Sequence, residues 1–315
     1  MTPQIILIAL VAGATSMVLL AAGLTGTSLA LPLMILSPLP IAIASLGWGS
    51  VIGFIAAVVA FMGLSLIATP TGGLLFIVLF GLPIAYLAHL AGLSRQDDPD
   101  QAEEWFPEST ILWRAVLIGG ATVGLAFMIS GFDAEEVTKR GLSEFAPTLE
   151  QLDTTTRETM ENAIRFQVKI TPYSMPMAWL LVMWLNLSLG IKIAKVSDRF
   201  NRPSFFLKMA ELPNLVIPVF GAAVLLSLIS PPLSFLGAAF FGIIIMAITI
   251  LGFNTVHVAT AHLPMRGVLL ASLYMAVLIL SIPILLVFGI GIADHFFKIR
   301  QRYRLANPHS PTNTP

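Results

Sequence analysis

Three polar side chains lie inside long apolar runs, where they could hydrogen-bond a small ligand. Asn186 lies in MAWLLVMWLNLSLG, and Asn254 and His257 lie in GFNTVHVATAHLPMR. Asn254 and His257 are three residues apart, so they share one face of a helix. Amide and imidazole groups in apolar helices also hydrogen-bond neighbouring helices, which is their commoner role. We therefore take Asn186, Asn254 and His257 as candidate ligand-binding residues, with interhelical hydrogen bonds as the alternative.

The same runs lack the groups that most catalytic chemistry needs. No Asp or Glu precedes Asp97, and none lies between Glu211 and Asp294, so buried carboxylates cannot form a proton relay there. His257 and His262 are five residues apart, which places them on different helix faces and argues against a metal pair. There is no cysteine, no phosphate-binding glycine loop and no HExxH or G-x-S-x-G motif. We expect a protein that is not an enzyme and that uses no metal or other cofactor.

Composition indicates the medium in which these residues lie. Of 315 residues, 57% are hydrophobic and 11% are charged, whereas a soluble domain has about 25% charged residues. The net charge is zero, which gives no electrostatic reason to bind nucleic acid. The sequence predicts an integral membrane protein whose main partner is the lipid bilayer.

Apolar runs of about 20 residues are long enough to cross a bilayer as helices. We expect an all-α fold, with residues 1–304 forming one polytopic transmembrane helix bundle of 8 to 9 membrane segments. Residues 305–315 are polar and rich in proline, and we expect a disordered C-terminal tail there. The nine predicted spans are 4–23, 28–47, 51–69, 74–93, 112–130, 174–194, 214–230, 234–260 and 267–290.

One polar insertion, residues 131–172, separates the fifth and sixth spans. It carries eight acidic and five basic residues. Apolar positions recur there every three or four residues, which predicts one amphipathic extramembrane helix from Ala146 to Ile170. A connector lying on the membrane surface or over the spans is the first interpretation, and a partner-docking helix is the second. The positions are Leu149, Leu152, Thr156, Met160, Ala163 and Phe166.

Basic residues predict the orientation, because loops rich in Lys and Arg stay in the cytoplasm. One basic loop follows residue 191, and the C-terminal segment IADHFFKIRQRYR supplies a second cluster that we expect to be a cytoplasmic anchor meeting anionic lipid. We place both segments on the cytoplasmic side of the membrane. The loop cations are Lys192, Lys195, Arg199, Arg202 and Lys208, and the anchor cations are Lys298, Arg300, Arg302 and Arg304.

An even number of crossings must separate these two basic segments, but the apolar runs between them number three. Four prolines break region 213–262, so we expect 214–230 and 234–260 to form one kinked passage, or one of them to re-enter the membrane. With eight crossings, both termini are cytoplasmic. Twelve of the 17 cations are then inside, and the five of 131–172 are outside.

Three segments carry a resemblance to a known family. LPLMILSPLPIAIASLGWGSVIGFIAA, GFNTVHVATAHLPMRGVLLASLY and GIADHFFKIRQRYR resemble the YybS-like family of bacterial integral membrane proteins, a domain of unknown function. The pattern of Gly291, Asp294, Phe297 and Arg300 is the most distinctive part. That family is similar in its helical core to the substrate-binding components of energy-coupling-factor transporters and to the shape-determination protein MreD. The resemblance implies a compact helical core, and it transfers no catalytic residue.

Two functions of different kinds follow from these observations. The first is a small-molecule-binding, transporter-component-like module that captures a ligand from the outer side and hands it to an ATPase. The second is a non-enzymatic cell-envelope scaffold or regulatory membrane subunit, similar to MreD. Convergence of Asn186, Asn254 and His257 on one cavity favours binding, whereas isolated interhelical hydrogen bonds favour the scaffold.

Overall fold

Helices make up nearly all of the regular structure. The computed structural model describes residues 2–23, 26–96, 98, 103–202, 211–280 and 282–306, so Lys208 and residues 307–315 of the expected disordered tail lie outside the described part. Two residue pairs form a small antiparallel ladder, β1 (Ser94–Arg95) with β2 (Glu104–Trp105). The helices are α1 (Pro3–Gly23), α2 (Ala30–Leu36), α3 (Leu39–Trp48), α4 (Ser50–Ile67), α5 (Pro70–Phe76), the π-helical turn η1 (Ile77–Gly81), α6 (Leu82–Ala91), α7 (Glu108–Ser130), α8 (Ala134–Leu149), α9 (Thr154–Val196), α10 (Val216–Ser227), α11 (Leu233–Ala259), α12 (Arg266–Leu280), α13 (Pro283–Phe297) and α14 (Ile299–Ala306).

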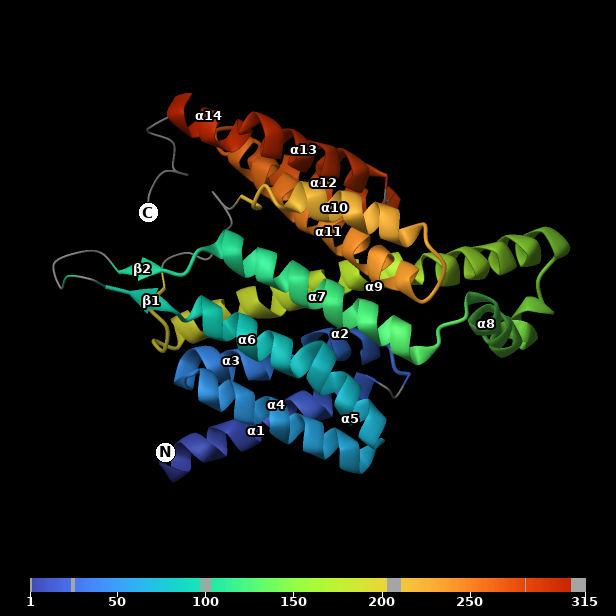
Figure 1. Ribbon diagram of the computed structural model, residues 1–315, viewed down its shortest axis with the longest axis horizontal. Coiled ribbons are helices and arrows are strands. Elements are labelled where there is room, and N and C mark those ends of the chain that lie inside the picture. Colours follow the sequence, from blue (N-terminus) through green and yellow to red (C-terminus); the bar gives the residue numbers. More distant parts are fainter. Residues whose placement is uncertain are drawn as a thin grey trace.

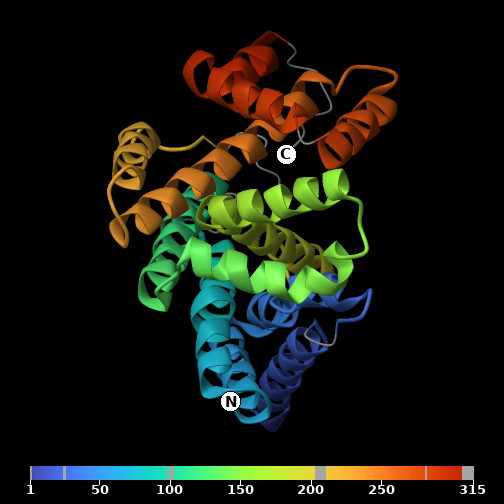
Figure 2. The ribbon, with the colours of Figure 1, turned by 90° about the vertical axis from the view of Figure 1, so that its right-hand side faces the viewer.

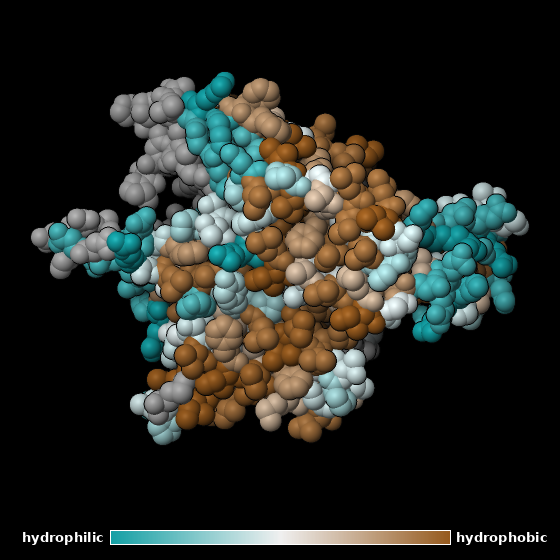
Figure 3. Space-filling view, in the orientation of Figure 1, coloured by the Kyte–Doolittle hydropathy of each residue, from teal (hydrophilic) through white to brown (hydrophobic). Residues whose placement is uncertain are grey.

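The helices lie side by side in one bundle with two chemically different ends (Figure 1). At one end, which we call the basic end, lie the start of α1, the β1–β2 ladder, the end of α9 and α14. At the other end, the hairpin end, α8 and the first half of α9 project beyond the remaining helices (Figures 1 and 2). Apolar surface covers the bundle between them, and polar surface gathers at the ends (Figure 3).

Seven helices of the described residues are long and apolar enough to cross a membrane. They are α1, α2 joined to α3, α4, α5 through α6, α7, α9 and α11. Large apolar side chains are exposed on their flanks, including Leu66 (85%) and Ile129 (84%). A soluble protein does not leave so much apolar surface in water. The protein is therefore an all-α membrane protein, as the composition predicts.

The last predicted span, 267–290, is not a single helix. α12 ends at Leu280 and α13 begins at Pro283, which has no N–H to continue a helix and occupies its first turn. α12 runs back along α11, since Tyr274 stacks on Phe253. α13 then runs parallel to α11, with Gly291 against Ile248. The prediction of one span at 267–290 is wrong.

The predicted kinked passage through 214–260 is also absent. α10 and α11 are separate helices that form an antiparallel hairpin, because Gly237 of α11 lies against Ser227 and Ala223 of α10. The turn between them contains Pro231 and Pro232, which cannot continue a helix. Because of the break between α12 and α13, four described helices, α10 to α13, lie between the two basic segments, where the sequence predicted three apolar runs. α10 has 12 residues, a length of about 18 Å, shorter than a hydrocarbon core of about 30 Å.

The predicted amphipathic helix from Ala146 to Ile170 is divided between two helices. α8 ends at Leu149, and α9 starts at Thr154, where Asp153 Oδ1 accepts the backbone N–H groups of Thr155 and Thr156 (both 3.1 Å). Hydrogen bonds from Thr156 and from the helix amides hold the pKa of Asp153 below its usual value. From this N-cap, α9 continues without a break for 43 residues into the predicted span at 174–194. The segment is thus the projecting half of a membrane helix and not a connector lying on the surface.

Glycines allow three helices to approach α11 at backbone distance. A Cβ at Gly242 would stand 2.0 Å from the carbonyl oxygen of Tyr173 in α9, and one at Gly252 would stand 2.0 Å from that of Val287 in α13. Gly237 lies as closely against α10. Gly120 and Gly124 of α7, which are four residues apart, pack against Phe240 and Leu236 of α11, as small residues at helix contacts in membranes do.

We expect Gly242→Ala to destabilise the bundle, because the new methyl group overlaps a backbone atom that cannot rotate away. Overpacking of this kind costs about 1–3 kcal/mol or more. Gly221→Ala is the matched control, since a Cβ there meets nothing within 4 Å. Thermal unfolding of the detergent-solubilised protein should give a lower midpoint for Gly242→Ala and an unchanged or slightly raised one for Gly221→Ala. Equal midpoints would contradict the close approach of α9 and α11.

Candidate functional site

Asn186 is fully buried, and its amide bonds to a helix break. Its Nδ2 donates to the carbonyl of Ile35 in α2 (2.8 Å) and to that of Val182 in its own helix (2.7 Å). The chain between α2 and α3 contains Pro38, which cannot donate a backbone hydrogen bond. Ser16 of α1 donates to the carbonyl of Ser37 at the same break. Asn186 therefore satisfies backbone acceptors that the break leaves free.

His257 and Asn254 lie together on α11, near the basic end. His257 Nε2 is 2.8 Å from the Tyr274 hydroxyl of α12, and its Nδ1 is 3.4 Å from a guanidinium nitrogen of Arg266. Asn254 is half-buried. The hydrogen-bond partners of Asn186 belong to α2 and α9, whereas those of His257 belong to α12. No hydrogen bond among the described residues joins the two sites.

The C-terminal cations are partly used in contacts within the protein. Asp294 accepts from the backbone N–H of Arg300 (2.9 Å) and from its Nε (2.7 Å), and both side chains are about 95% buried. Lys298 pairs with Glu211. Arg302 is exposed, and the side chain of Arg304 lies outside the described part. The Asp294–Arg300 pair is therefore shielded from water, between the end of α13 and the start of α14.

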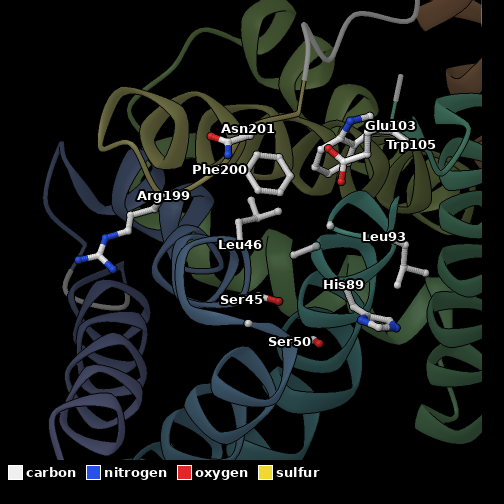
Figure 4. Close-up of a pocket in the computed structure, with 13 residues that line it drawn as sticks. Ser45, Leu46, Ser50, His89, Leu93, Glu103, Trp105, Arg199, Phe200 and Asn201 are labelled. Carbon is white, nitrogen blue, oxygen red and sulfur yellow. The ribbon is translucent and has the colours of Figure 1, made fainter. Parts of the chain in front are cut away.

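A cavity of about 360 Å³ opens at the basic end, and we call it the end cavity. The turn between α3 and α4, the end of α6 and the chain after α9 form its walls (Figure 4). Gly49 makes the turn with φ +100°, a conformation that other residues rarely adopt. The lining comprises Ser45, Leu46, Gly49, Ser50, Ala88, His89, Gly92, Leu93, Glu103, Trp105, Arg199, Phe200 and Asn201.

The end cavity combines aromatic walls with several polar groups. Trp105 and Phe200 meet edge to face, with ring centroids 5.5 Å apart. Ser45 is 95% buried, and its hydroxyl has no hydrogen-bond partner in the described structure. Arg199 extends away from the cavity (Figure 4) and stacks on Trp48, with its guanidinium 5.3 Å from the ring. The cavity can therefore accept hydrogen bonds and a flat ring.

Arg202 forms hydrogen bonds that connect the elements around the end cavity. Its guanidinium donates to the carbonyl of Ala91 at the end of α6 and to that of Phe106 before α7, both at 2.8 Å. It also lies 5.7 Å from the Trp105 ring and 3.9 Å from a Glu108 carboxylate oxygen. Burial lowers the pKa of Arg202, and the negative charge of Glu108 opposes that shift. Arginine nevertheless stays protonated, so a charged clamp joins α6, α7 and the chain after α9.

Sequence reasoning missed most of this site. From the sequence, Arg202 serves only as one of the basic residues that predict the cytoplasmic side. Nothing in its local pattern shows which carbonyl groups it contacts. The glycines around Trp48 do indicate the turn that forms one wall. No group of three or more His, Asp and Glu side chains that could hold a metal gathers in the part of the chain that the structure describes.

Comparisons with known proteins give no further assignment: no protein-family model, no curated protein and no solved structure matches the chain.

We expect Arg202→Gln to destabilise the basic end, because two carbonyls and a carboxylate lose a charged donor. Each hydrogen bond to a charged group contributes about 1.5–3 kcal/mol. Arg302→Gln removes the same charge from an exposed side chain at the same end, and surface changes of that kind stay within about 0.5 kcal/mol. Thermal unfolding in detergent should separate the two variants clearly. Indistinguishable midpoints would show that Arg202 does not clamp these elements.

Proposed function

We propose that this protein is a multi-pass protein of the bacterial inner membrane that binds a small molecule in the end cavity. The carrying observation is the cavity itself, whose size falls in the range of ligand pockets of about 300–1,000 Å³. Its walls come from α3, α4, α6, Trp105 and the chain after α9. Such a site between helix ends suits a module that receives or releases a molecule at one membrane face.

The lining favours a compact polar ligand with a flat ring. Trp105 and Phe200 offer aromatic surface, and the unpartnered Ser45 hydroxyl offers a hydrogen bond. Glu103 supplies a carboxylate at the mouth, while the guanidinium of Arg199 is directed elsewhere (Figure 4). A neutral or cationic molecule therefore suits the site better than an anion. Asn186, Asn254 and His257 do not line the cavity, so they have no place in this proposal.

The proposed orientation places the basic end in the cytoplasm. The five cations of 131–172 belong to the hairpin end, and the cations of the other described segments lie at or near the basic end. Loops on the cytoplasmic side carry this excess of Lys and Arg. Both termini are then cytoplasmic, and the end cavity opens inward rather than toward the outer side. In this orientation α10, α12 and α13 also run between the two ends of the bundle beside the seven long helices, although each is shorter than a hydrocarbon core.

The transporter-component character rests on the resemblance of three segments to the YybS-like family and, through it, to energy-coupling-factor components. In this proposal an ATPase at the cytoplasmic face is the partner. The basic end provides charged surface for such a partner, with Arg302 exposed on α14.

A second candidate is a cell-envelope scaffold or regulatory subunit. Its support is that Asn186 and His257 make separate hydrogen bonds between helices, as structural residues do. The α8–α9 hairpin also projects from the bundle (Figure 1) and offers a surface to an envelope protein.

The orientation can be tested with single cysteines, since the natural chain has none. We expect Gln151→Cys, in the turn between α8 and α9, to react with a membrane-impermeant maleimide on intact spheroplasts. Arg302→Cys should react only after the membrane is permeabilised. The reverse pattern would invert the assignment, and labelling of both sites before permeabilisation would show that they share one side.

The binding function can be tested by purifying the tagged protein from its natural host in mild detergent and identifying bound compounds by mass spectrometry. We expect a small molecule with the wild type, and its loss in Ser50→Leu, which fills part of the end cavity. Ser197→Leu is the control, because Ser197 is exposed at the same end and does not line the cavity. A compound that both variants retain equally would refute this site. Envelope proteins without any bound compound would favour the scaffold.

A further inference from the structure

Arg266 stands out because no charge in the described structure balances it. It begins α12, and no carboxylate among the described residues pairs with it. The chain has no Asp or Glu between Glu211 and Asp294. Those two acids are already engaged, since Glu211 pairs with Lys298 and Asp294 pairs with Arg300. A cation that is half-buried beside apolar helices is costly unless an anion accompanies it.

The groups around Arg266 form a donor cluster between α11 and α12. Its Nε is buried without a hydrogen-bond partner in the described residues, and its other nitrogen lies 3.4 Å from His257 Nδ1. The Tyr274 hydroxyl is 2.8 Å from His257 Nε2. The Tyr274 ring stacks on Phe253 with centroids 5.2 Å apart, which fixes its position. Because a guanidinium only donates, His257 Nδ1 accepts from Arg266 and its Nε2–H donates to the Tyr274 oxygen. The outer N–H groups of Arg266 and the hydroxyl proton of Tyr274 then remain to donate to one oxyanion.

The place of this cluster in the fold indicates where the anion comes from. No residue of α12 whose burial is described is fully buried, so this helix lies at the edge of the bundle with one side facing outward. Beside Arg266, Met265 is 67% exposed and Val268 is 60% exposed. The cluster lies at the basic end of apolar helices, which is the depth of lipid headgroups, and the exposed flank of α12 continues from it toward the hydrocarbon. Basic pockets between helix ends are where phospholipid headgroups bind.

We propose that Arg266, His257 and Tyr274 form a binding site for the phosphate of an anionic phospholipid, with the acyl chains along α12. Arg266 contacts the phosphate through the outer N–H groups of its guanidinium, the Tyr274 hydroxyl donates a further hydrogen bond, and His257 positions both groups. The site is separate from the end cavity, so it does not depend on the proposed function.

The test uses the full chain, purified in detergent and stripped of lipid, with thermal unfolding followed during titration with lipid. Phosphatidylglycerol should raise the unfolding midpoint of the wild type, whereas phosphatidylcholine and inorganic phosphate should not. Arg266→Gln should abolish the response to phosphatidylglycerol. Arg114→Gln, which removes an exposed cation of α7 outside the predicted lipid anchor, should retain it.

Two further variants keep the test decisive if Arg266→Gln folds poorly. Arg266→Lys preserves the charge but not the guanidinium fork, and it should raise the lipid concentration for half the effect about tenfold. Tyr274→Phe should weaken the response in the same direction. A wild-type shift that phosphatidylcholine reproduces would overturn the proposal, and so would an unaltered response in Arg266→Lys. A shift that inorganic phosphate alone reproduces would overturn the assignment to lipid.

Discussion

Backbone contact with α11 is the constraint on which the arrangement of the other helices depends. In lipid, two apolar helices gain little hydrophobic free energy by meeting, so their association relies on close van der Waals contact. Gly237, Gly242 and Gly252 provide that contact on three sides of α11, toward α10, α9 and α13. The position of α9 then determines where its C-terminal chain, with Phe200 and Arg202, meets α6 and α7. The end cavity and the buried Asp294–Arg300 pair both follow from this packing.

Where the backbone of the bundle departs from a regular helix, side chains of other elements donate hydrogen bonds to the carbonyl groups left free. Asn186 and Ser16 meet the carbonyls at the break between α2 and α3. The Trp179 indole of α9 donates to the Leu79 carbonyl within the π-helical turn. Arg202 does the same at the ends of α6 and the β1–β2 segment. Because a hydrocarbon interior offers no water to free carbonyls, each departure from a regular helix needs such a partner. These polar side chains of the bundle thus act as hydrogen-bond donors to backbone carbonyl groups of other helices.

Composition and apolar run length were sufficient to predict the membrane class, the all-α fold and most helix positions, because both depend only on local sequence. The break at Pro283 escaped prediction, since its apolar neighbours hide a single proline within an otherwise continuous run. Asp153 is the N-cap of α9 and so marks its start at Thr154. The prediction overlooked this cap, because the apolar periodicity of 146–170 continues across it. Ser45, Trp105 and Arg202 come from segments up to 157 positions apart in the chain. No local pattern shows that such residues meet, so the end cavity required the structure.

The 43 residues of α9 give it a length of about 65 Å, roughly twice the thickness of a hydrocarbon core. One end stands outside the bundle beside α8, and the other leads directly into Arg199 and Phe200 at the end cavity. A single continuous backbone therefore connects the projecting hairpin with the wall of the end cavity. Pro172 and Pro176, near the middle of α9, each lack the N–H that would continue the hydrogen-bond ladder, so any bend of this helix is expected there.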